Sequence, residues 1–288
     1  MAEPSTTPPT PPTTTRAVLT TGANSGIGLA TVIELAKRGF HSIGSVRSDA
    51  KAEVVHDRAR QAGVEVETIL LDVTDADQCE RAMAGLHLYG LVNNAGYAVT
   101  GAVEDVDDDE ARQLFETMVH APMRLARLAL PAMRDNDGQG GRIVNVSSIA
   151  GRTTAPFAGH YTGAKHALEA LSDALRIEVA HDGVKVVLVE PGGFKTGIWE
   201  EFERDVAKRE ANGSRYSAAY RRSLQGQRLL EPIMGNPQQC AKVIATALTT
   251  RYPRSRYLVG LDAQAMNLAD TLTPTFLKDR VMRFGLGI

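Results

Sequence analysis

Two hydrophobic patterns alternate along the chain from residue 16 onward. Short apolar runs end in turns, and most are followed by a segment in which apolar residues recur every three or four positions, as on one face of a helix. The short runs predict strands over residues 16–22, 40–47, 65–73, 86–96, 141–148, 184–193 and 255–260. The periodic segments predict helices over residues 26–39, 49–61, 75–84, 107–133, 160–180 and 237–250.

This alternation predicts an α/β fold of the doubly wound, Rossmann type. Strands that alternate with helices form right-handed βαβ units, so the sheet is parallel and helices cover both of its faces. We expect a three-layer sandwich with a mostly parallel seven-stranded sheet, formed by residues 16–288 as one domain. The charged helical stretch 197–235 departs from the alternation, and we interpret it as a lid over the carboxyl ends of the strands, where ligands bind in this fold.

Composition narrows the classes of protein. Residues 1–15 are mostly Pro and Thr, which predicts a disordered arm, and they lack the basic and apolar regions of a signal peptide. No apolar run has the length of a membrane span, and the two cysteines lack metal-binding spacing. A net charge of -2 argues against a nucleic-acid partner. We therefore expect a cytoplasmic protein with no stable membrane insertion and no metal.

A glycine-rich loop, TGANSGIG, lies between the first strand and the first helix. Glycines allow a tight turn and bring backbone amides close to a pyrophosphate, while the helix N-terminus offers unpaired N–H groups to the anion. The strand–loop–helix context predicts nucleotide binding. The candidate cofactor-binding residues in this loop are Gly22, Asn24, Ser25, Gly26, Ile27 and Gly28.

Four further motifs follow in order. They are LDV with Asp72 and Val73; NNAG with Asn94, Ala95 and Gly96; Ser148 followed thirteen residues later by Tyr161 and then Lys165; and PGGFKT with Pro191, Gly192 and Thr196. With the TGxxxGxG loop, these motifs identify a chain that resembles the short-chain dehydrogenase/reductase family from about residue 16 to the C-terminal tail. The family consists of single-domain oxidoreductases that use NAD(H) or NADP(H).

The resemblance implies a role for each motif. The LDV segment would contact the adenine, NNAG would line the cofactor, and PGGFKT would hold the nicotinamide end. Tyr161 would be the general acid/base, and Ser148 would bind the substrate oxygen. Lys165 would lower the phenol pKa from its ordinary value of about 10 and hydrogen-bond the nicotinamide ribose, so Tyr161 and Lys165 also count as cofactor contacts.

One position departs from the family pattern. Met118 stands where the family usually carries a catalytic asparagine that helps to hold a water linking the lysine to solvent. A thioether is only a weak acceptor and has no hydrogen to donate. The proton route then runs through a backbone carbonyl and water, or through His120 or Thr117, or activity is reduced; we expect Met118 itself to pack.

The end of the second strand bears on the choice of cofactor. An acidic residue there would bind the ribose 2′-hydroxyl of NAD, but Val46 occupies that position, Arg47 follows, and Asp49 lies too far along. An arginine accommodates the 2′-phosphate of NADP. The sequence therefore favours NADP(H), with NAD(H) as the alternative.

The leading interpretation is an oxidoreductase that interconverts a secondary alcohol and a ketone or aldehyde. Apolar residues of the lid, together with Tyr97, suit a lipophilic small molecule, although the lid residues could equally pack onto the body. A non-catalytic dinucleotide-binding sensor or scaffold is the alternative, and a lyase or epimerase a weaker one. The long helices 107–133 and 160–180 form dimer interfaces in many relatives, so we expect a homodimer or homotetramer.

Overall fold

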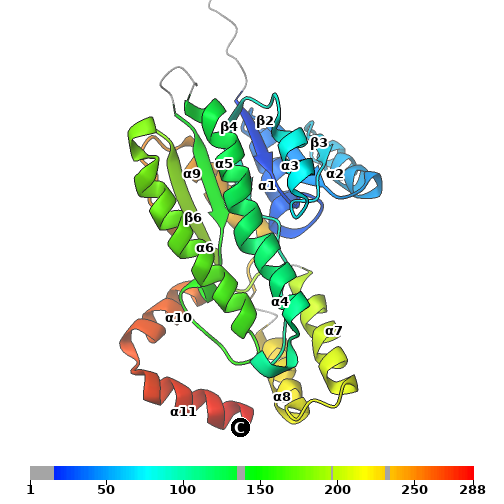
Figure 1. Cartoon of the computed structure of the whole chain (residues 1–288), viewed down its shortest axis with the longest axis vertical. Helices are drawn as coiled ribbons and strands as arrows, with labels where there is room; N and C mark the ends of the chain where they lie inside the picture. The colour runs from blue at the N-terminus through cyan, green and yellow to red at the C-terminus, as the bar shows by residue number, and fades with distance from the viewer. Residues whose placement is uncertain (1–15, 135–139, 196, 231–233) are drawn as a thin grey trace, which may run out of the picture.

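The computed structural model describes residues 16–134, 140–195, 197–230 and 234–288. Its strands form one parallel sheet in the order β3-β2-β1-β4-β5-β6-β7, which confirms the doubly wound prediction (Figure 1). The strands are β1 (Ala17–Thr20), β2 (His41–Val46), β3 (Glu67–Leu70), β4 (Leu88–Asn93), β5 (Arg142–Val146), β6 (Lys185–Pro191) and β7 (Arg256–Val259).

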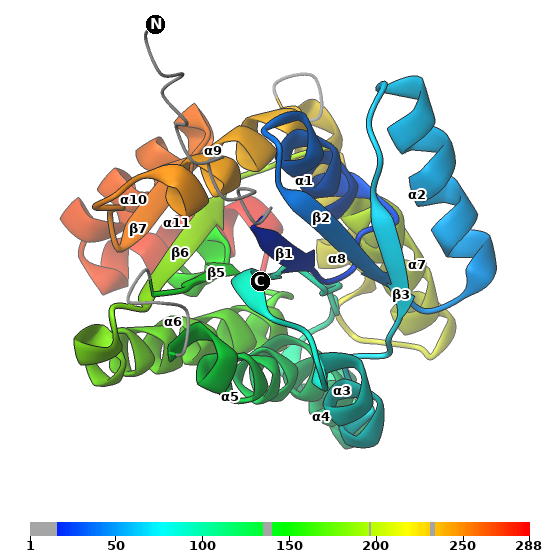
Figure 2. The same cartoon turned by 90° about the horizontal axis from the view of Figure 1, so that it is seen from above.

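Helices cover both faces of this sheet (Figure 2). One layer holds α1 (Gly26–Lys37), α2 (Asp49–Gln61) and α9 (Pro237–Thr249), and the other holds α3 (Ala76–Met83), α4 (Asp108–Phe115), α5 (Ala121–Arg134) and α6 (Gly159–Glu178). Successive strand residues point into opposite layers, as a period of two requires. Leu19, Leu91, Ile143 and Val186 pack against α5, whereas Val18, Val92, Val144 and Val187 pack against α9.

The strand order reverses beside β1. The chain runs outward through β2 and β3, then returns to place β4 on the other side of β1. A crevice opens outside the carboxyl ends of strands at such a reversal, and ligands bind there. The glycine loop after β1 and the NNAG motif at the end of β4 meet at this point.

The helical run predicted over residues 107–133 contains an irregular turn. Residues Glu116–His120 form a π-helical turn between α4 and α5. Pro122 has no N–H, so it cannot donate to the carbonyl of Met118 four residues earlier, and the regular α-helical ladder is interrupted there. Single π turns of this kind occur frequently at functional sites.

Two pairs of helices extend beyond the layered body (Figure 1). The predicted lid contains α7 (Ile198–Ala211) and α8 (Ser217–Leu230). The C-terminal segment forms α10 (Leu261–Leu272), which the sequence pattern did not indicate, and α11 (Thr275–Leu286). Leu286 of α11 packs against the lid, and its carbonyl accepts a hydrogen bond of 2.9 Å from Arg222 of α8. The C-terminal helices therefore reach back to the lid.

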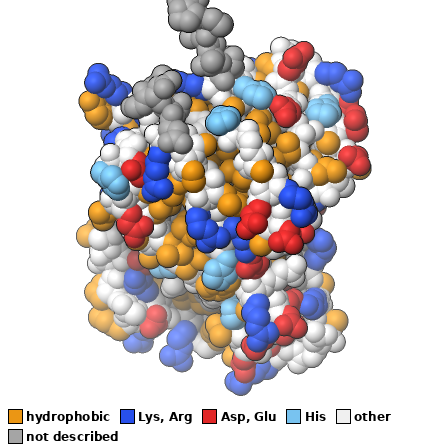
Figure 3. All heavy atoms as spheres, turned by 45° about the horizontal axis from the view of Figure 1, so that its top comes forward, with side chains coloured by type: hydrophobic (Ala, Val, Ile, Leu, Met, Phe, Trp, Pro, Cys, Tyr) orange, Lys and Arg blue, Asp and Glu red, His pale blue; other side chains and the backbone are white. Residues whose placement is uncertain are grey.

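Surface charge is mixed on the face in Figure 3, where basic and acidic side chains are interspersed. This distribution agrees with the net charge of -2 and shows no broad basic surface on that face. Among the described residues, no helix has both the length and the apolar character needed to cross a membrane.

Candidate active site

The glycine loop is held in a conformation that side chains would block. Gly22 and Gly26 have positive φ angles of 67° and 52°. A Cβ on Gly28 would lie 2.3 Å from the carbonyl oxygen of Gly22 and 2.5 Å from the amide nitrogen of Asn94. The α1 N-cap residue, Ser25, makes no side-chain capping bond, which leaves the first-turn amides of Gly26, Ile27 and Gly28 available to an anion. The loop thus fits a dinucleotide pyrophosphate.

The NNAG segment fastens this loop. The side-chain amide of Asn94 donates to the carbonyl of Thr21 at 2.9 Å and to that of Gly22 at 3.3 Å. In return, the Thr21 hydroxyl oxygen accepts bonds from the backbone amides of Asn94 and Ala95. Asn24 and Gly96 lie at the same rim, with Gly96 exposed. Asn94 therefore shapes the cofactor loop from the neighbouring strand.

The other predicted adenosine contacts also lie at carboxyl strand ends. Arg47 is exposed immediately after β2, and Asp49 is used as the first residue of α2. The Asp72 carboxylate accepts hydrogen bonds from the amide and hydroxyl of Thr74 at 3.0 and 2.7 Å, which fix its orientation. Val73 is buried. Arg47 and Asp72 thus flank the position expected for the adenosine half.

The three predicted catalytic residues come together from β5 and α6. The Ser148 hydroxyl oxygen accepts a bond from the Ala150 amide at 3.1 Å, which caps the short helix that follows β5. Tyr161 and Lys165 lie one turn apart on α6, with the ammonium 5.8 Å from the phenol ring centre. The buried Lys165 ammonium donates to the carbonyl of Val146 at 2.9 Å. Ser148 also forms a hydrogen bond with the Tyr161 phenol, which lowers the phenol pKa.

Burial dominates the ionisation of both α6 residues. It raises the pKa of the Tyr161 phenol, and the charge of Glu201 on the lid adds to that rise, while the bond with Ser148 opposes it. Burial lowers the pKa of Lys165 to about 8, and the charge of Glu169 acts in the opposite sense. Without a cofactor, the phenol is thus better prepared to donate a proton than to accept one.

Met118 packs, as the sequence analysis expected. Its side chain is buried in a cluster that includes Leu114, Val119 and Ala164, and its terminal methyl would lie 3.0 Å from a Cβ on Gly96. His120 is exposed, and the Thr117 hydroxyl donates to the carbonyl of Gln113 at 2.9 Å.

The segment after β6 is positioned by a residue that sequence reasoning missed. Asp262, in the first turn of α10, accepts a bond of 2.5 Å from the amide of Gly193. A Cβ on Gly192 would lie 2.2 Å from the same carboxylate, so glycine is required for this approach. Pro191 accepts a bond of 3.4 Å from Ser148. Thr196 lies outside the described residues.

The lid contacts the segment that follows NNAG through its backbone. The amides of Ala98 and Thr100 donate to the carboxylates of Glu201 and Asp205, at 3.1 and 2.7 Å. The amide of Ala102 donates to the Tyr220 hydroxyl at 2.7 Å. We call these three contacts the lid latch.

Two further groups join the lid to the body. Glu110 on α4 forms ion pairs with Lys208 and Arg209 of the lid, at 2.5 and 2.8 Å. Phe157, four residues before Tyr161, adopts a positive φ of 68° and packs edge-on against Tyr220 with ring centres 4.6 Å apart. Strained backbone of this kind concentrates at functional sites. The loop before Tyr161 and the lid are thus one packed unit.

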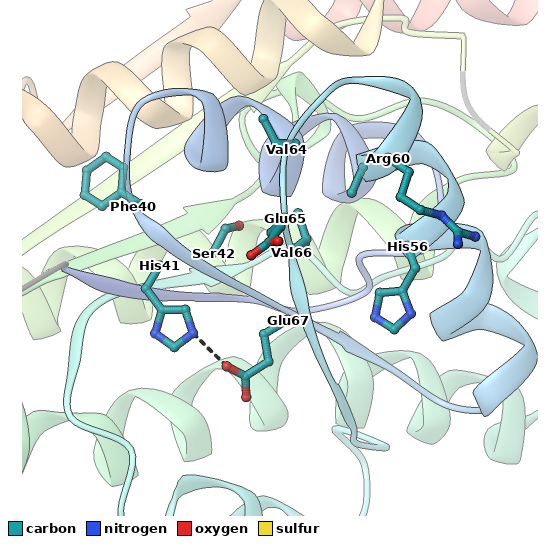
Figure 4. Close-up of a pocket in the computed structure, with 10 residues that line it drawn as sticks. Phe40, His41, Ser42, His56, Arg60, Val64, Glu65, Val66 and Glu67 are labelled. Carbon is teal, nitrogen blue, oxygen red and sulfur yellow. Dashed lines mark hydrogen bonds and ion pairs between the residues drawn. The ribbon is translucent and has the colours of Figure 1, made fainter.

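Two hollows differ in their relation to this chemistry. One of about 310 Å³ lies between the lid and α4 and is lined by Tyr97, Gln113, Glu201 and Asp205, among others. A larger one of about 760 Å³ lies at the amino ends of β2 and β3 and includes the His41–Glu67 pair, 2.6 Å apart (Figure 4). The second hollow is at the opposite end of the sheet from the glycine loop, so it is separate from the candidate active site.

Comparison with known proteins identifies the family of the chain. The family model described as short chain dehydrogenase matches residues 16–207. Human retinol dehydrogenase 5 is 31% identical over 287 residues, covering 93% of this chain and 88% of its own length. A short-chain dehydrogenase from Streptomyces avermitilis superposes with a TM-score of 0.75 at 31% identity, covering 95% of this chain and 96% of that one. A dehydrogenase from Beutenbergia cavernae, solved with bound NADP, superposes with a TM-score of 0.70 at 26% identity, covering 88% of this chain and 97% of the other.

These matches define the class. The chain belongs to the short-chain dehydrogenase family, and it is an NAD(P)-dependent oxidoreductase that acts on CH–OH groups of small-molecule substrates.

Proposed function

We propose that the protein interconverts a secondary alcohol and a ketone or aldehyde, with Tyr161 as the general acid/base. The observation that carries this proposal is the convergence of Ser148, Tyr161 and Lys165 at the carboxyl ends of β5 and β6. When bound, the nicotinamide supplies or accepts the hydride. The chain's own residues bind the substrate oxygen and move its proton.

In the reduction direction, Tyr161 donates its proton to the substrate oxygen while that oxygen gains negative charge. The raised pKa of the phenol suits this role, because the group is protonated at neutral pH. Ser148 hydrogen-bonds the same oxygen and stabilises the developing charge. In the oxidation direction, the positive charges of Lys165 and of the oxidised cofactor lower the phenol pKa, so that Tyr161 accepts the alcohol proton.

The proton leaves Tyr161 by a route that does not need an asparagine side chain. Pro122 cannot donate to the Met118 carbonyl, and we propose that this backbone oxygen holds a water of the proton route. The buried Met118 side chain and the exposed His120 support the backbone route over a side-chain substitute. We therefore expect the wild type, with Met118 in place of an asparagine, to turn over substrate.

NADP(H) is the preferred cofactor in this proposal. Arg47 is exposed after β2 where a 2′-phosphate would lie, and the related dehydrogenase from Beutenbergia cavernae was solved with bound NADP. The test is fluorescence titration of the wild type and Arg47→Ala with NADPH and NADH, with Arg58→Ala on α2 as the matched control. We expect Arg47→Ala alone to weaken NADPH binding by about tenfold or more. Tighter binding of NADH by the wild type would contradict the assignment.

The substrate we propose is lipophilic. Phe157 packs in an apolar cluster with Phe202 and Tyr220 of the lid, and human retinol dehydrogenase 5 is a relative. A panel of long-chain and cyclic alcohols and ketones, set against polar sugars and hydroxy acids of similar size, tests this class. Higher kcat/KM for the polar set would contradict it.

Self-association is also proposed. Leu171 and Ile177 on α6 are exposed, at 42% and 69%, on one of the helices that the sequence analysis assigned to a dimer interface. Sedimentation of the wild type and of a Leu171→Glu, Ile177→Glu variant tests this surface. A wild type that remains monomeric at micromolar concentration would rule it out.

The decisive experiment for the reaction is Tyr161→Phe, with the exposed Tyr252→Phe as control. General acid–base catalysis contributes about 10²- to 10⁴-fold, so we expect kcat/KM to fall by that factor in Tyr161→Phe while NADPH binding is retained. Unchanged turnover would remove Tyr161 from the mechanism. A wild type that binds NADPH but reduces no carbonyl would favour the sensor interpretation.

A further inference from the structure

Two buried carboxyl groups, one on α6 and one on β6, have no part in the reaction described above. Glu190 lies at the end of β6, immediately before Pro191, and is 0% exposed. Glu169 lies on α6, one turn after Lys165, and is 7% exposed. Buried carboxylates are costly unless positive charges or protons compensate them.

The compensating positive charge is incomplete. The Arg256 Nε atom lies 3.0 Å from Glu169 and 3.2 Å from Glu190, so one guanidinium serves both carboxyls. The Arg256 Nη2 atom contacts Asp173 at 2.5 Å, and Asp173 also pairs with Arg176. The half-exposed Arg152 reaches Glu190 only at 3.5 Å. A third acidic group thus competes for the shared arginine.

A retained proton resolves this imbalance. Oε1 of Glu169 and both carboxyl oxygens of Glu190 are buried without a hydrogen-bond partner among the described residues. Burial and the charge of Glu169 raise the pKa of Glu190 to about 7, against the lowering by Arg152 and Arg256. Glu190 is therefore the member of the pair that holds the proton.

The pair is connected to the active site through Lys165. Residues four apart on a helix share a face, and the charge of Glu169 raises the pKa of the Lys165 ammonium against the lowering by burial. We propose that Glu169 and Glu190 form a proton-holding carboxyl pair that acts as a positioning device for Lys165, keeping its ammonium charged. The proposal rests on the role of Lys165 given under the proposed function.

The test compares Glu169→Gln and Glu190→Gln with Glu178→Gln, an exposed glutamate on the same helix. The first readout is the pH dependence of the NADPH dissociation constant, measured by fluorescence without substrate. We expect the alkaline loss of affinity to move about one pH unit lower in Glu169→Gln, a tenfold change in proton concentration, and to stay in place in Glu178→Gln. Glu169→Asp should move it back toward the wild-type position. Superimposable curves for the wild type and Glu169→Gln would overturn the proposal.

The second readout detects the retained proton directly. Infrared spectra of the wild type should contain the band of a protonated carboxyl that disappears with a midpoint near pH 7, and Glu190→Gln should lack this band. If Glu190→Gln still shows this band, the proposal of a proton-holding carboxyl pair is overturned. This measurement remains available if Glu169→Gln does not fold.

Neither readout requires turnover, so the two proposals fail separately. Shifted NADPH affinity together with an inactive wild type would support the carboxyl pair and count against the proposed reaction. A wild type that reduces carbonyls while the pH curves of NADPH affinity coincide in the wild type and Glu169→Gln would do the reverse.

Discussion

The glycine loop and the lid both contact the segment that begins at NNAG, the loop at Asn94 and the lid from Ala98 onward, but they are built differently. The loop depends on close packing around its backbone, since Gly28 leaves no room for a Cβ between the Gly22 carbonyl and the side-chain amide of Asn94. The lid depends on charged and polar side chains, which reach across to backbone amides and to Glu110. A close backbone contact cannot rearrange unless the chain itself moves. The ion pairs and hydrogen bonds of side chains can be lost one at a time. The loop should therefore fail completely when altered, and the lid by degrees.

The largest effect should come from Gly28→Ala. The added Cβ would meet the Gly22 carbonyl at 2.3 Å, a backbone atom that cannot move without opening the loop. We expect a loss of at least about 3 kcal/mol in stability and no measurable NADPH binding. Chemical denaturation and fluorescence titration check this. Gly226→Ala in α8, where a Cβ meets nothing within 4 Å, is the matched control.

A smaller effect is expected from Glu110→Gln, and it should depend on pH. Burial acts to raise the Glu110 pKa, but hydrogen bonds and charges of Arg209 and Lys208 lower it to about 2. Because the folded pKa is below the ordinary 4.5, the stabilisation is present above that value and is lost as the pH falls toward 2. We expect Glu110→Gln to cost about 2 kcal/mol at pH 7, after allowance for solvent exposure, and almost nothing at pH 2.

Denaturant unfolding across that pH range measures the difference. A constant penalty from pH 7 to pH 2 would mean that Glu110 acts through packing and that its ion pairs are without effect.

Breaking one contact of the lid latch should cost less again. Asp205→Ala leaves the Thr100 amide without its acceptor, which corresponds to about 1 kcal/mol. We expect KM for the substrate to rise several-fold while the NADPH dissociation constant stays unchanged, because the glycine loop is untouched. Steady-state kinetics and cofactor titration on the same preparation separate the two; a matching loss of NADPH affinity would show that the loop and lid are not independent.

The smallest effect should follow from a side-chain substitution at Ala98, a residue that contacts the lid through its backbone amide. Ala98→Ser retains the amide that donates to Glu201, so we expect a change below about 0.5 kcal/mol in stability. Thermal unfolding tests this. A cost as large as that of Asp205→Ala would indicate that the lid also depends on the Ala98 side chain.

The hydrophobic periodicity of the sequence was sufficient to predict the strands and helices of the layered body. The predicted range 49–61 coincides with α2, and each predicted strand contains an observed one, because turn residues and apolar rhythm are local signals. It was insufficient for α10, where LDAQAMNLAD follows β7 directly and carries a weak apolar pattern. The π turn at Glu116–His120 was also not predicted, although Pro122 marks its position.

The candidate site likewise contains residues that the sequence motifs predicted and residue pairs that they did not. Motifs placed Ser148, Tyr161 and Lys165 correctly on the end of β5 and on α6, since their spacing is local. Asp262 against Gly193, and Glu169 against Glu190, join residues far apart in sequence. Such pairs depend on the strand order of the sheet, which no single sequence window contains.

The lid latch has a consequence for how this enzyme could diverge. Every amide it uses, at Ala98, Thr100 and Ala102, belongs to the main chain and is the same whatever side chain the residue carries. Mutations in that segment can therefore reshape the wall that meets a substrate while the closing contacts persist. New substrates become reachable through single substitutions, without an intermediate whose lid no longer closes.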